Sequence, residues 1–348
     1  MTQRHVLITR LTAMGDVAMT APIITAACKA HPDVLFDVLS TPFFEPFFEP
    51  LPNLRFLGTN IRKERHGIPA LWRLFQDLRH DRLAHNPSNS HIHYDDIIDL
   101  HDVLRTKVLR TLFRLTGSNV HVINKGRSEK HRLVSGKSHK QLTPTTSRYA
   151  QVFRDAHLPI PDSLNIRPRQ PLPHALDNLH KGNDKWIGIS PFAQHRGKMY
   201  PLDRMTQVID LLLTRPDIRI FIFGGGTNEQ QLAQSLTRNL DRCSSMIGVM
   251  SLSDEMALMS NLDIMLSMDS SAMHVSSLFG IRVISLWGAT HPYAGFLGYG
   301  QSPDDCLQRS DINCRPCSIF GNKPCRFSDY HCFDIPPQSV ANHILNSL

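Results

Sequence analysis

The chain lacks any long apolar stretch. None of its 348 residues lie in a run that approaches the roughly 18 uninterrupted apolar residues of a membrane-spanning helix. The apolar segment after Arg4 covers only residues 5–9, which is too short for a signal-peptide core, and no small-residue cleavage site follows it. These absences exclude an integral membrane protein, and we expect a cytoplasmic one.

Acidic residues are outnumbered by basic ones in the first half of the chain but not in the second. Residues 1–174 carry 24 Lys and Arg against 15 Asp and Glu, whereas residues 175–348 carry 14 against 16. The run from Lys125 to Lys140 is the longest basic cluster. It either forms an ordinary solvated surface or attracts a polyanion such as nucleic acid, an anionic membrane face or a phosphorylated glycolipid.

Length and hydrophobic patterning predict two α/β domains. A chain of 348 residues exceeds the size at which one core keeps growing. Short apolar runs alternate with amphipathic stretches in both halves, which favours parallel strands with covering helices. The expected strands are 5–9, 34–39, 54–57, 96–100, 120–123, 186–190, 218–223, 264–267 and 283–286.

The prolines of residues 159–183 indicate a linker between these halves. We therefore predict an N-terminal Rossmann-like domain over 1–170, a C-terminal one over 184–332, and a final helix over 333–348 that packs toward the N-terminal domain. Two doubly wound domains would place a ligand cleft between them. The segment 42–50 repeats proline and phenylalanine, which predicts turns or one short helix that docks aromatic side chains.

The first segment with chemical potential follows strand 5–9. It contains Met14, Gly15 and Asp16 at a turn from a buried strand into a helix. A carboxylate there can cap the helix and interact with its dipole. It can equally act as a base toward a ligand, because such turns expose reactive groups in open α/β sheets.

Two further segments follow strands of the second half. The loop after strand 186–190 holds Gln194 and Lys198 among small polar residues, which suits a phosphate. The strand 218–223 ends in three glycines that include Gly225, with Glu229 five residues after the strand-ending Gly224. The glycines form either a plain tight turn or a close approach to a nucleotide whose ribose Glu229 would bind, and Glu229 breaks the dinucleotide fingerprint G-x-G-x-x-G.

A fourth segment runs from strand 264–267 into a helical pattern. Ser270 and Ser271 would place hydroxyl and N–H groups at a helix start, which suits an anion. Asp269 either caps the helix or takes part in the site with Lys198 or His274 offsetting its charge. His274 taken alone is typical of a buried, hydrogen-bonded histidine.

Five of the seven cysteines lie after residue 305. Cys314 and Cys317 have the spacing of metal ligands, and Cys325 with Cys332 would complete a four-thiolate structural site. The favoured alternative is plain thiols packed in a C-terminal cap, and we assign no metal to catalysis.

In their order along the chain, these motifs resemble the ADP-heptose:lipopolysaccharide heptosyltransferases, glycosyltransferase family 9. The resemblance rests on three motifs. They are T-x-M-G-D early in the chain, the small polar loop ending in Lys198, and D-S-S-x-M-H followed by the segment 287–290. The resemblance covers nearly the whole chain. It implies a GT-B architecture in which the N-terminal domain binds the acceptor and the C-terminal domain binds the nucleotide sugar.

The resemblance also implies residue roles. Asp16 matches the catalytic base, and Arg62, Lys63, Met14 and Gly15 fall where the acceptor binds. The donor-binding residues would be Lys198, Gln194, Gly225, Glu229, Asp269, Ser270, Ser271 and His274. The reaction would be an inverting, metal-independent transfer without a cofactor, from ADP-heptose to an anionic lipopolysaccharide core acceptor. The enzyme would touch the cytoplasmic face of the inner membrane peripherally, and no nucleic acid is expected.

Alternatives remain open at this level. Ser270 and Ser271 replace a threonine–glycine pair of the family, so a glycosyltransferase that uses a UDP- or GDP-hexose donor is an alternative. A nicotinamide-dependent dehydrogenase also uses doubly wound domains, although the chain lacks its G-x-G-x-x-G fingerprint. A non-catalytic carbohydrate- or nucleic-acid-binding protein would use the basic half. The chain has no Asp-x-Asp pair of the kind that holds a metal–diphosphate complex.

Overall fold

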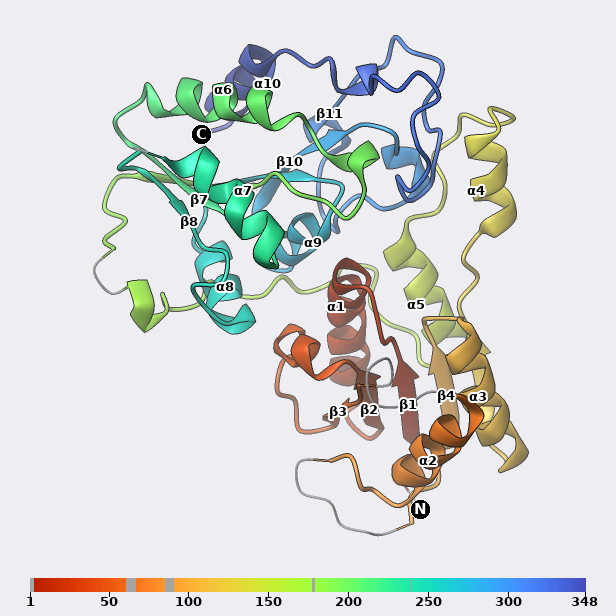
Figure 1. The fold of residues 1–348 in the computed structure, drawn as a ribbon. Coiled ribbons are helices and arrows are strands. Elements are labelled where there is room, and N and C mark those ends of the chain that lie inside the picture. Colours follow the sequence, from red (N-terminus) through yellow and green to blue (C-terminus); the bar gives the residue numbers. More distant parts are fainter. Residues whose placement is uncertain (1–2, 61–66, 85–90, 177–178, 239) are drawn as a thin grey trace. The chain divides into compact units, whose positions relative to one another are not determined.

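The computed structural model describes residues 3–60, 67–84, 91–176, 179–238 and 240–348. The chain divides into two compact units, one made of Met1–Lys125 and Thr145–Asn165 and the other of Gly126–Pro144 and Ile166–Leu348. Each unit contains a parallel sheet with helices packed on it, so the predicted α/β class with two doubly wound domains is confirmed (Figure 1). Among the helices of the described ranges, none is long and apolar enough to cross a membrane.

The first unit is built on a five-stranded parallel sheet in the order β3-β2-β1-β4-β5. Its strands are β1 (His5–Thr9), β2 (Leu35–Ser40), β3 (Leu54–Gly58), β4 (Asp96–Asp99) and β5 (Asn119–Val122). Its helices are α1 (Met14–Ala30), α2 (Gly67–Arg79), α3 (Leu104–Leu115) and α5 (Thr145–Asp155). The strand order reverses between β1 and β4, and ligands of open parallel sheets bind at such a reversal.

Local sequence explains the central elements of this unit. All five residues of β1 are buried, as expected for a strand that pairs on both edges inside a parallel sheet. The proline–phenylalanine repeat forms one short 3-10 helix, η1 (Pro42–Phe47), with Phe44 and Phe47 buried. This agrees with the prediction of a short helix that docks aromatic side chains.

The second unit is built on a six-stranded parallel sheet in the order β11-β10-β9-β6-β7-β8. Its strands are β6 (Lys185–Ser190), β7 (Ile218–Ile222), β8 (Cys243–Ser245), β9 (Ile264–Met268), β10 (Arg282–Trp287) and β11 (Cys306–Gln308). Its helices are α4 (Arg127–Val134), α6 (Leu202–Leu213), α7 (Thr227–Thr237), α8 (Leu252–Met259), α9 (Ser271–Ser277) and α10 (Pro337–Leu345). Here the order reverses between β6 and β9, where Ser190 pairs with Ser267.

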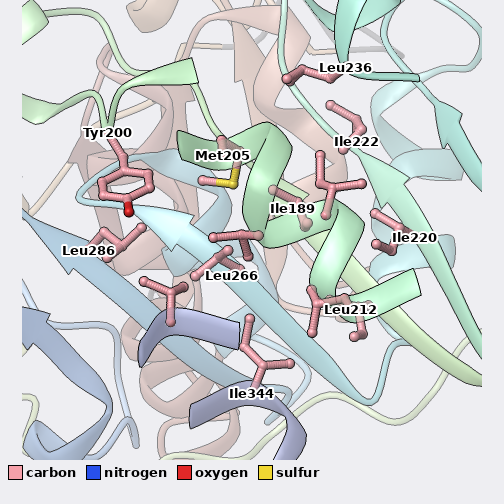
Figure 2. Close-up of a cluster of buried hydrophobic side chains, with 14 of the residues drawn as sticks. Ile189, Tyr200, Met205, Leu212, Ile220, Ile222, Leu236, Leu266, Leu286 and Ile344 are labelled. Carbon is pink, nitrogen blue, oxygen red and sulfur yellow. The ribbon is translucent and has the colours of Figure 1, made fainter. Parts of the chain in front are cut away.

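The core of the second unit lies between its sheet and helices α6 and α10. Figure 2 shows Met205 and Leu212 of α6 near strand residues such as Ile189 and Leu266. The C-terminal helix, which we expected to pack toward the N-terminal domain, is α10 of the second unit. Its buried residues Val340, Ala341 and Ile344 belong to the core of the second unit, because their apolar face packs against α6.

The predicted N-terminal domain, residues 1–170, includes a segment that belongs to the second unit. Helix α4 and the segment up to Pro144 belong to the second unit, and the chain then returns to the first unit with α5. The N–H of Leu142 donates to the Tyr293 carbonyl at 2.9 Å, and the ammonium of Lys130 lies 4.4 Å from the Phe296 ring centroid. These contacts attach the basic run to the C-terminal unit.

Candidate active site

In the first unit, Asp16 lies where β1 leads into α1. It is the third residue of the helix, and its carboxylate is 3.5 Å from the N–H of Ala13. That contact is long for a cap. The nearer partner is Arg10, whose guanidinium nitrogen lies 2.5 Å from an Asp16 oxygen. The Asp16 side chain is 33% exposed, so a ligand can reach a carboxylate that Arg10 holds in place.

Arg10 is itself fixed by buried partners. It follows β1 directly, is only 5% exposed, and donates to the carbonyl of Leu100 at 2.7 Å. Its guanidinium carbon lies 5.9 Å from the centre of the Tyr149 ring of α5. A buried cation needs such partners to offset the loss of water. Arg10 is a residue of this site that the sequence patterns did not single out.

A second residue that the sequence patterns do not mark is His101, which follows β4. Its Nδ1 accepts a hydrogen bond from the N–H of Leu11 at 3.4 Å, so the neutral ring carries its proton on Nε2. Burial, followed by the charges of Arg10 and Lys125, lowers the pKa of His101 to about 3. The imidazole is therefore neutral at physiological pH and ties the loop after β1 to the end of β4.

Asp99 organises the same edge of the sheet. It is fully buried and accepts from the backbone N–H groups of His101 and Asp102, each at 2.9 Å. Arg110 of α3 donates to its second oxygen at 2.6 Å. The carboxylate is thus saturated by structural partners, and its position explains why the turn after β4 holds His101 beside the Asp16 loop.

Two of the four residues expected to bind the acceptor lie within the described ranges. Met14 and Gly15 form the first turn of α1 and are both partly exposed beside Asp16. Arg62 and Lys63 lie outside the described residues.

In the second unit, Lys198 and Asp269 come together at the reversal of strand order. Lys198 ends the 3-10 helix η3 (Arg196–Lys198) after β6, and Asp269 directly follows β9. The ammonium nitrogen is 2.9 Å from an Asp269 oxygen, and Asp269 is only 3% exposed. Ser270, not Asp269, is the N-cap residue of α9. The capping-only role considered for Asp269 is therefore wrong.

The C-terminal tail holds the Lys198 loop. Gly321 has a φ of +72°, and a Cβ atom there would lie 2.6 Å from Cγ of Lys198. The carbonyl of Gly197 accepts from the N–H of Ala289 at 2.8 Å. Arg315 is buried and donates to the carbonyls of Gly288 and Thr290, and burial lowers its pKa to about 10. The tail thereby sets the position of Lys198.

The serines follow Asp269 as predicted. The hydroxyls of Ser267 and Ser270 lie 3.2 Å apart, and Ser271 begins α9. Both Ser270 and Ser271 are partly exposed, whereas His274 is buried within this two-turn helix. Small polar groups therefore flank the Lys198–Asp269 pair.

The glycine turn after β7 lies beside the loop that contains Gln194. A Cβ atom on Gly224 would be 2.9 Å from the Phe192 ring, which shows how closely these two loops approach. Gln194 and Gly225 are exposed, and nothing lies within 4 Å of a Cβ atom on Gly225. The Glu229 carboxylate accepts from the N–H of Gly225 at 2.8 Å. One oxygen of the Glu229 carboxylate thus stabilises the glycine turn that precedes it.

The four cysteines of the candidate structural site do not assemble one. Cys314 lies 3.5 Å from Nε2 of His331, and Cys325 lies 3.9 Å from an oxygen of Asp329. Across the described ranges, no three His, Cys, Asp or Glu side chains are grouped so that they could hold a metal ion. Burial raises the pKa of the Cys332 thiol to about 12, in keeping with a packed thiol.

Comparison with known proteins gives one family and several similar folds. The sequence model described as glycosyltransferase family 9 (heptosyltransferase) matches residues 90–330. No curated protein sequence matches the chain.

Three solved structures illustrate the fold, and all are below 20% identity. The glycosyl transferase family 9 protein from Veillonella parvula DSM 2008 is 18% identical, with a TM-score of 0.74 and coverage of 100% of this chain and 98% of that one. The E. coli ADP-heptose lps heptosyltransferase II is 16% identical, with a TM-score of 0.67 and coverage of 99% and 98%. The E. coli heptosyltransferase WaaC with ADP is 19% identical, with a TM-score of 0.66 and coverage of 99% and 100%.

Proposed function

Because the chain belongs to glycosyltransferase family 9, we propose that it transfers a heptose from an ADP-sugar to the anionic core of a lipopolysaccharide or lipooligosaccharide, with inversion at the anomeric carbon. The observation that carries the proposal is the placement of one reactive pair at the strand-order reversal of each sheet. Arg10 holds Asp16 in the first unit, and Asp269 holds Lys198 in the second.

Asp16 has the properties required of a general base. The acceptor hydroxyl must lose its proton as its oxygen bonds to the anomeric carbon, and a positioned carboxylate assists such a step by about 10²–10⁴-fold. Asp16 is one-third exposed and held by Arg10. We propose that Asp16 accepts this proton while the acceptor binds over Met14 and Gly15.

Lys198 has the properties required to stabilise the leaving group. The bond between the anomeric carbon and the donor phosphate breaks as the new bond forms, and the electron pair departs with the nucleoside diphosphate. A cation fixed before the reaction stabilises that charge most effectively. Lys198 is held by Asp269 at 2.9 Å, and the partly exposed Ser270 and Ser271 directly follow Asp269 in the chain. We propose that these groups hold the diphosphate without a divalent metal or cofactor, in keeping with a sequence that has no Asp-x-Asp pair.

The nucleoside would lie over the glycine turn after β7. Gly225 is exposed and leaves open space for a ligand, and Glu229 is anchored to its N–H. The second carboxylate oxygen of Glu229 can then accept from ribose hydroxyls. The E. coli heptosyltransferase WaaC has been solved with ADP-2-deoxy-2-fluoro heptose. This likeness supports ADP-heptose as the first donor to test. We propose His274 and Gln194 as further donor-binding residues.

The donor can be tested by thermal stabilisation of the purified chain. A ligand at 100 times its Kd adds about 2.7 kcal/mol to stability, so ADP-heptose should raise Tm clearly. Greater stabilisation by UDP- or GDP-hexose would replace the donor but keep the enzyme class. Stabilisation by NAD or NADP alone would overturn the proposal.

Two variants separate the roles of the two units. Asp16→Asn should bind the donor with wild-type affinity and lose at least about 10²-fold in transfer rate. Lys198→Ala should weaken donor binding as well as turnover. Near wild-type transfer by Asp16→Asn would remove it as the base, and unchanged ADP affinity in Lys198→Ala would remove the phosphate role. A mass-spectrometric assay of the glycosylated acceptor supplies the rate.

A further inference from the structure

Three segments of the second unit contact one another. The segment 126–144, which includes α4, is attached to 291–296 through Leu142 and Tyr293, and the Lys130 ammonium lies 4.4 Å from the Phe296 ring centroid. Phe296 in turn lies 5.9 Å, centroid to centroid, from Phe320 of the segment 318–327. We call residues 126–144, 291–296 and 318–327 the basic–aromatic surface. Its helix α4 is drawn in yellow in Figure 1.

This surface is strongly cationic. It contains seven Lys and Arg residues against one acidic residue, Glu129. Among the cations, six belong to exposed residues, namely Arg127, Arg132, Lys137, Lys140, Lys323 and Arg326. The second half of the chain carries a net negative charge by sequence, so these cations concentrate positive potential on one part of the second unit.

Large aromatic side chains are exposed among these cations. Phe320 is 56% exposed, Phe327 is 51% exposed and Tyr293 is 39% exposed. The guanidinium carbon of Arg326 lies 4.6 Å from the centroid of the Phe327 ring. Helix α4 buries only Leu133, and its Arg127 and Arg132 are exposed. Exposed aromatic rings next to a cluster of Lys and Arg are the composition of proteins that bind the interface of an anionic membrane.

We propose that the basic–aromatic surface docks the enzyme on an anionic lipid bilayer, with the cations at the headgroups and Phe320 and Phe327 in the interfacial layer. The choice of a bilayer over nucleic acid rests on the proposed function, because its acceptor is a glycolipid held in a membrane. The surface lies entirely in the second unit, although the sequence places most of its cations within the predicted N-terminal domain.

The proposal is tested by sedimentation of the full-length protein with two kinds of vesicle. Vesicles of phosphatidylcholine mixed with phosphatidylglycerol should bind the protein, and vesicles of phosphatidylcholine alone should not. Binding should weaken as salt rises, because screening shortens the range of the headgroup potential. Equal binding to both vesicles would overturn the proposal.

Variants assign the binding to this surface. The triple variant Arg132→Glu, Lys137→Glu, Lys140→Glu should lose at least about 100-fold in vesicle affinity, because each basic residue near an anionic surface contributes roughly a factor of five and the new carboxylates are repelled by the headgroups. The matched control Arg73→Glu, Arg114→Glu, Arg238→Glu reverses the same number of exposed charges elsewhere and should bind normally. Equal losses in the two variants would mean that net charge alone drives binding.

The aromatic contribution is measured with Phe320→Ser, Phe327→Ser. This variant should bind anionic vesicles at least about tenfold more weakly, whereas Leu104→Ser, Leu115→Ser, which also removes two exposed apolar side chains, should not. Tighter binding of single-stranded RNA than of vesicles through the same cations would overturn the bilayer assignment.

Transfer to a water-soluble, delipidated acceptor separates the two proposals. The charge-reversal variant should keep this activity at the wild-type level, because Arg132, Lys137 and Lys140 lie outside the proposed donor- and acceptor-binding groups and outside the tail that holds Lys198. If the wild type binds anionic vesicles but transfers no sugar, the proposed function fails while the docking surface stands. If it transfers sugar but ignores vesicles, the docking proposal alone fails.

Discussion

The guanidinium of Arg10 lies 2.5 Å from the carboxylate of Asp16, and Arg10 is held from behind by the carbonyl of Leu100. The pair joins the ends of β1 and β4, the two strands between which the sheet order reverses. A surface ion pair would contribute little to stability. This one instead fixes the direction of a partly exposed carboxylate, so its main consequence is positional.

Replacing Arg10 by glutamine should slow transfer more than it weakens binding. A misplacement of the base by about 1 Å can cost about 10²-fold in rate, whereas the proposed donor groups lie in the other unit and should bind as before. We expect a fall in kcat with an unchanged Kd for ADP, measured by steady-state kinetics and calorimetry. Arg55→Gln is the control, because it removes the partner of the buried carboxylate of Asp37 away from the site and should lower Tm without lowering kcat. A parallel fall of kcat in both variants would contradict the positional role.

The low pKa of His101 makes the first unit less stable in mild acid. The unfolded chain titrates this side chain near about 6.5, whereas the folded pKa is about 3. Above the unfolded pKa of about 6.5, His101 is neutral in both the folded and the unfolded state, so its titration does not lower the free energy of unfolding. As the pH falls from about 6.5 toward about 3, the unfolded state binds a proton that the folded state does not, so the free energy of unfolding falls by up to about 1.4 kcal/mol per pH unit.

Hydrogen exchange of the amides in β1 and β4 reports this loss in the unit that carries His101. His101→Asn, which cannot take up the proton, should show a smaller loss of protection between about pH 7 and about pH 4. Identical pH dependence in the two proteins would show that other groups control acid stability. The second unit serves as the internal control, since its strands should respond equally in both.

The sequence predicted the elements whose patterns are local. The fully buried β1 and the turn to α1 could be read from a short apolar run followed by Gly15 and Asp16. Strands β8 and β11 were missed because each has three residues, which is too few to display a period. The assignment of α4 to the second unit depends on contacts with Phe296 and Tyr293, far away in the sequence.

The same distinction applies to the candidate site. Lys198 and Asp269 each follow an apolar strand, so the sequence could mark both, but only the fold reveals that they pair. Arg10, His101 and Arg315 were missed because their importance comes from partners distant in sequence. No local pattern distinguishes an arginine buried against a distant carbonyl from an exposed one.

The buried thiols should resist alkylation in the folded protein. Burial raises the pKa of Cys28, Cys243 and Cys332 to about 12, so at pH 8 only about one in 10⁴ of each would be thiolate. Iodoacetamide followed by peptide mass spectrometry should find these three unmodified, and all seven modified in urea. Rapid native labelling of Cys332 would show that the C-terminal tail opens, and would undermine its role in holding Lys198.

Gly321→Ala tests whether the tail positions Lys198. The alanine methyl group would lie 2.6 Å from Cγ of Lys198, and the φ of +72° adds backbone strain of about 1–2 kcal/mol. We expect lower Tm together with an approximately tenfold weaker Kd for ADP, since the ammonium must move from its place beside Asp269. Gly300→Ala is the matched control, because Gly300 has a φ of +73° and nothing lies within 4 Å of a Cβ atom there. It carries the same backbone strain without touching Lys198. Calorimetric titration of ADP into both variants separates the effects: equal affinities at equal loss of Tm would mean that the tail stabilises the unit but does not set the position of the lysine.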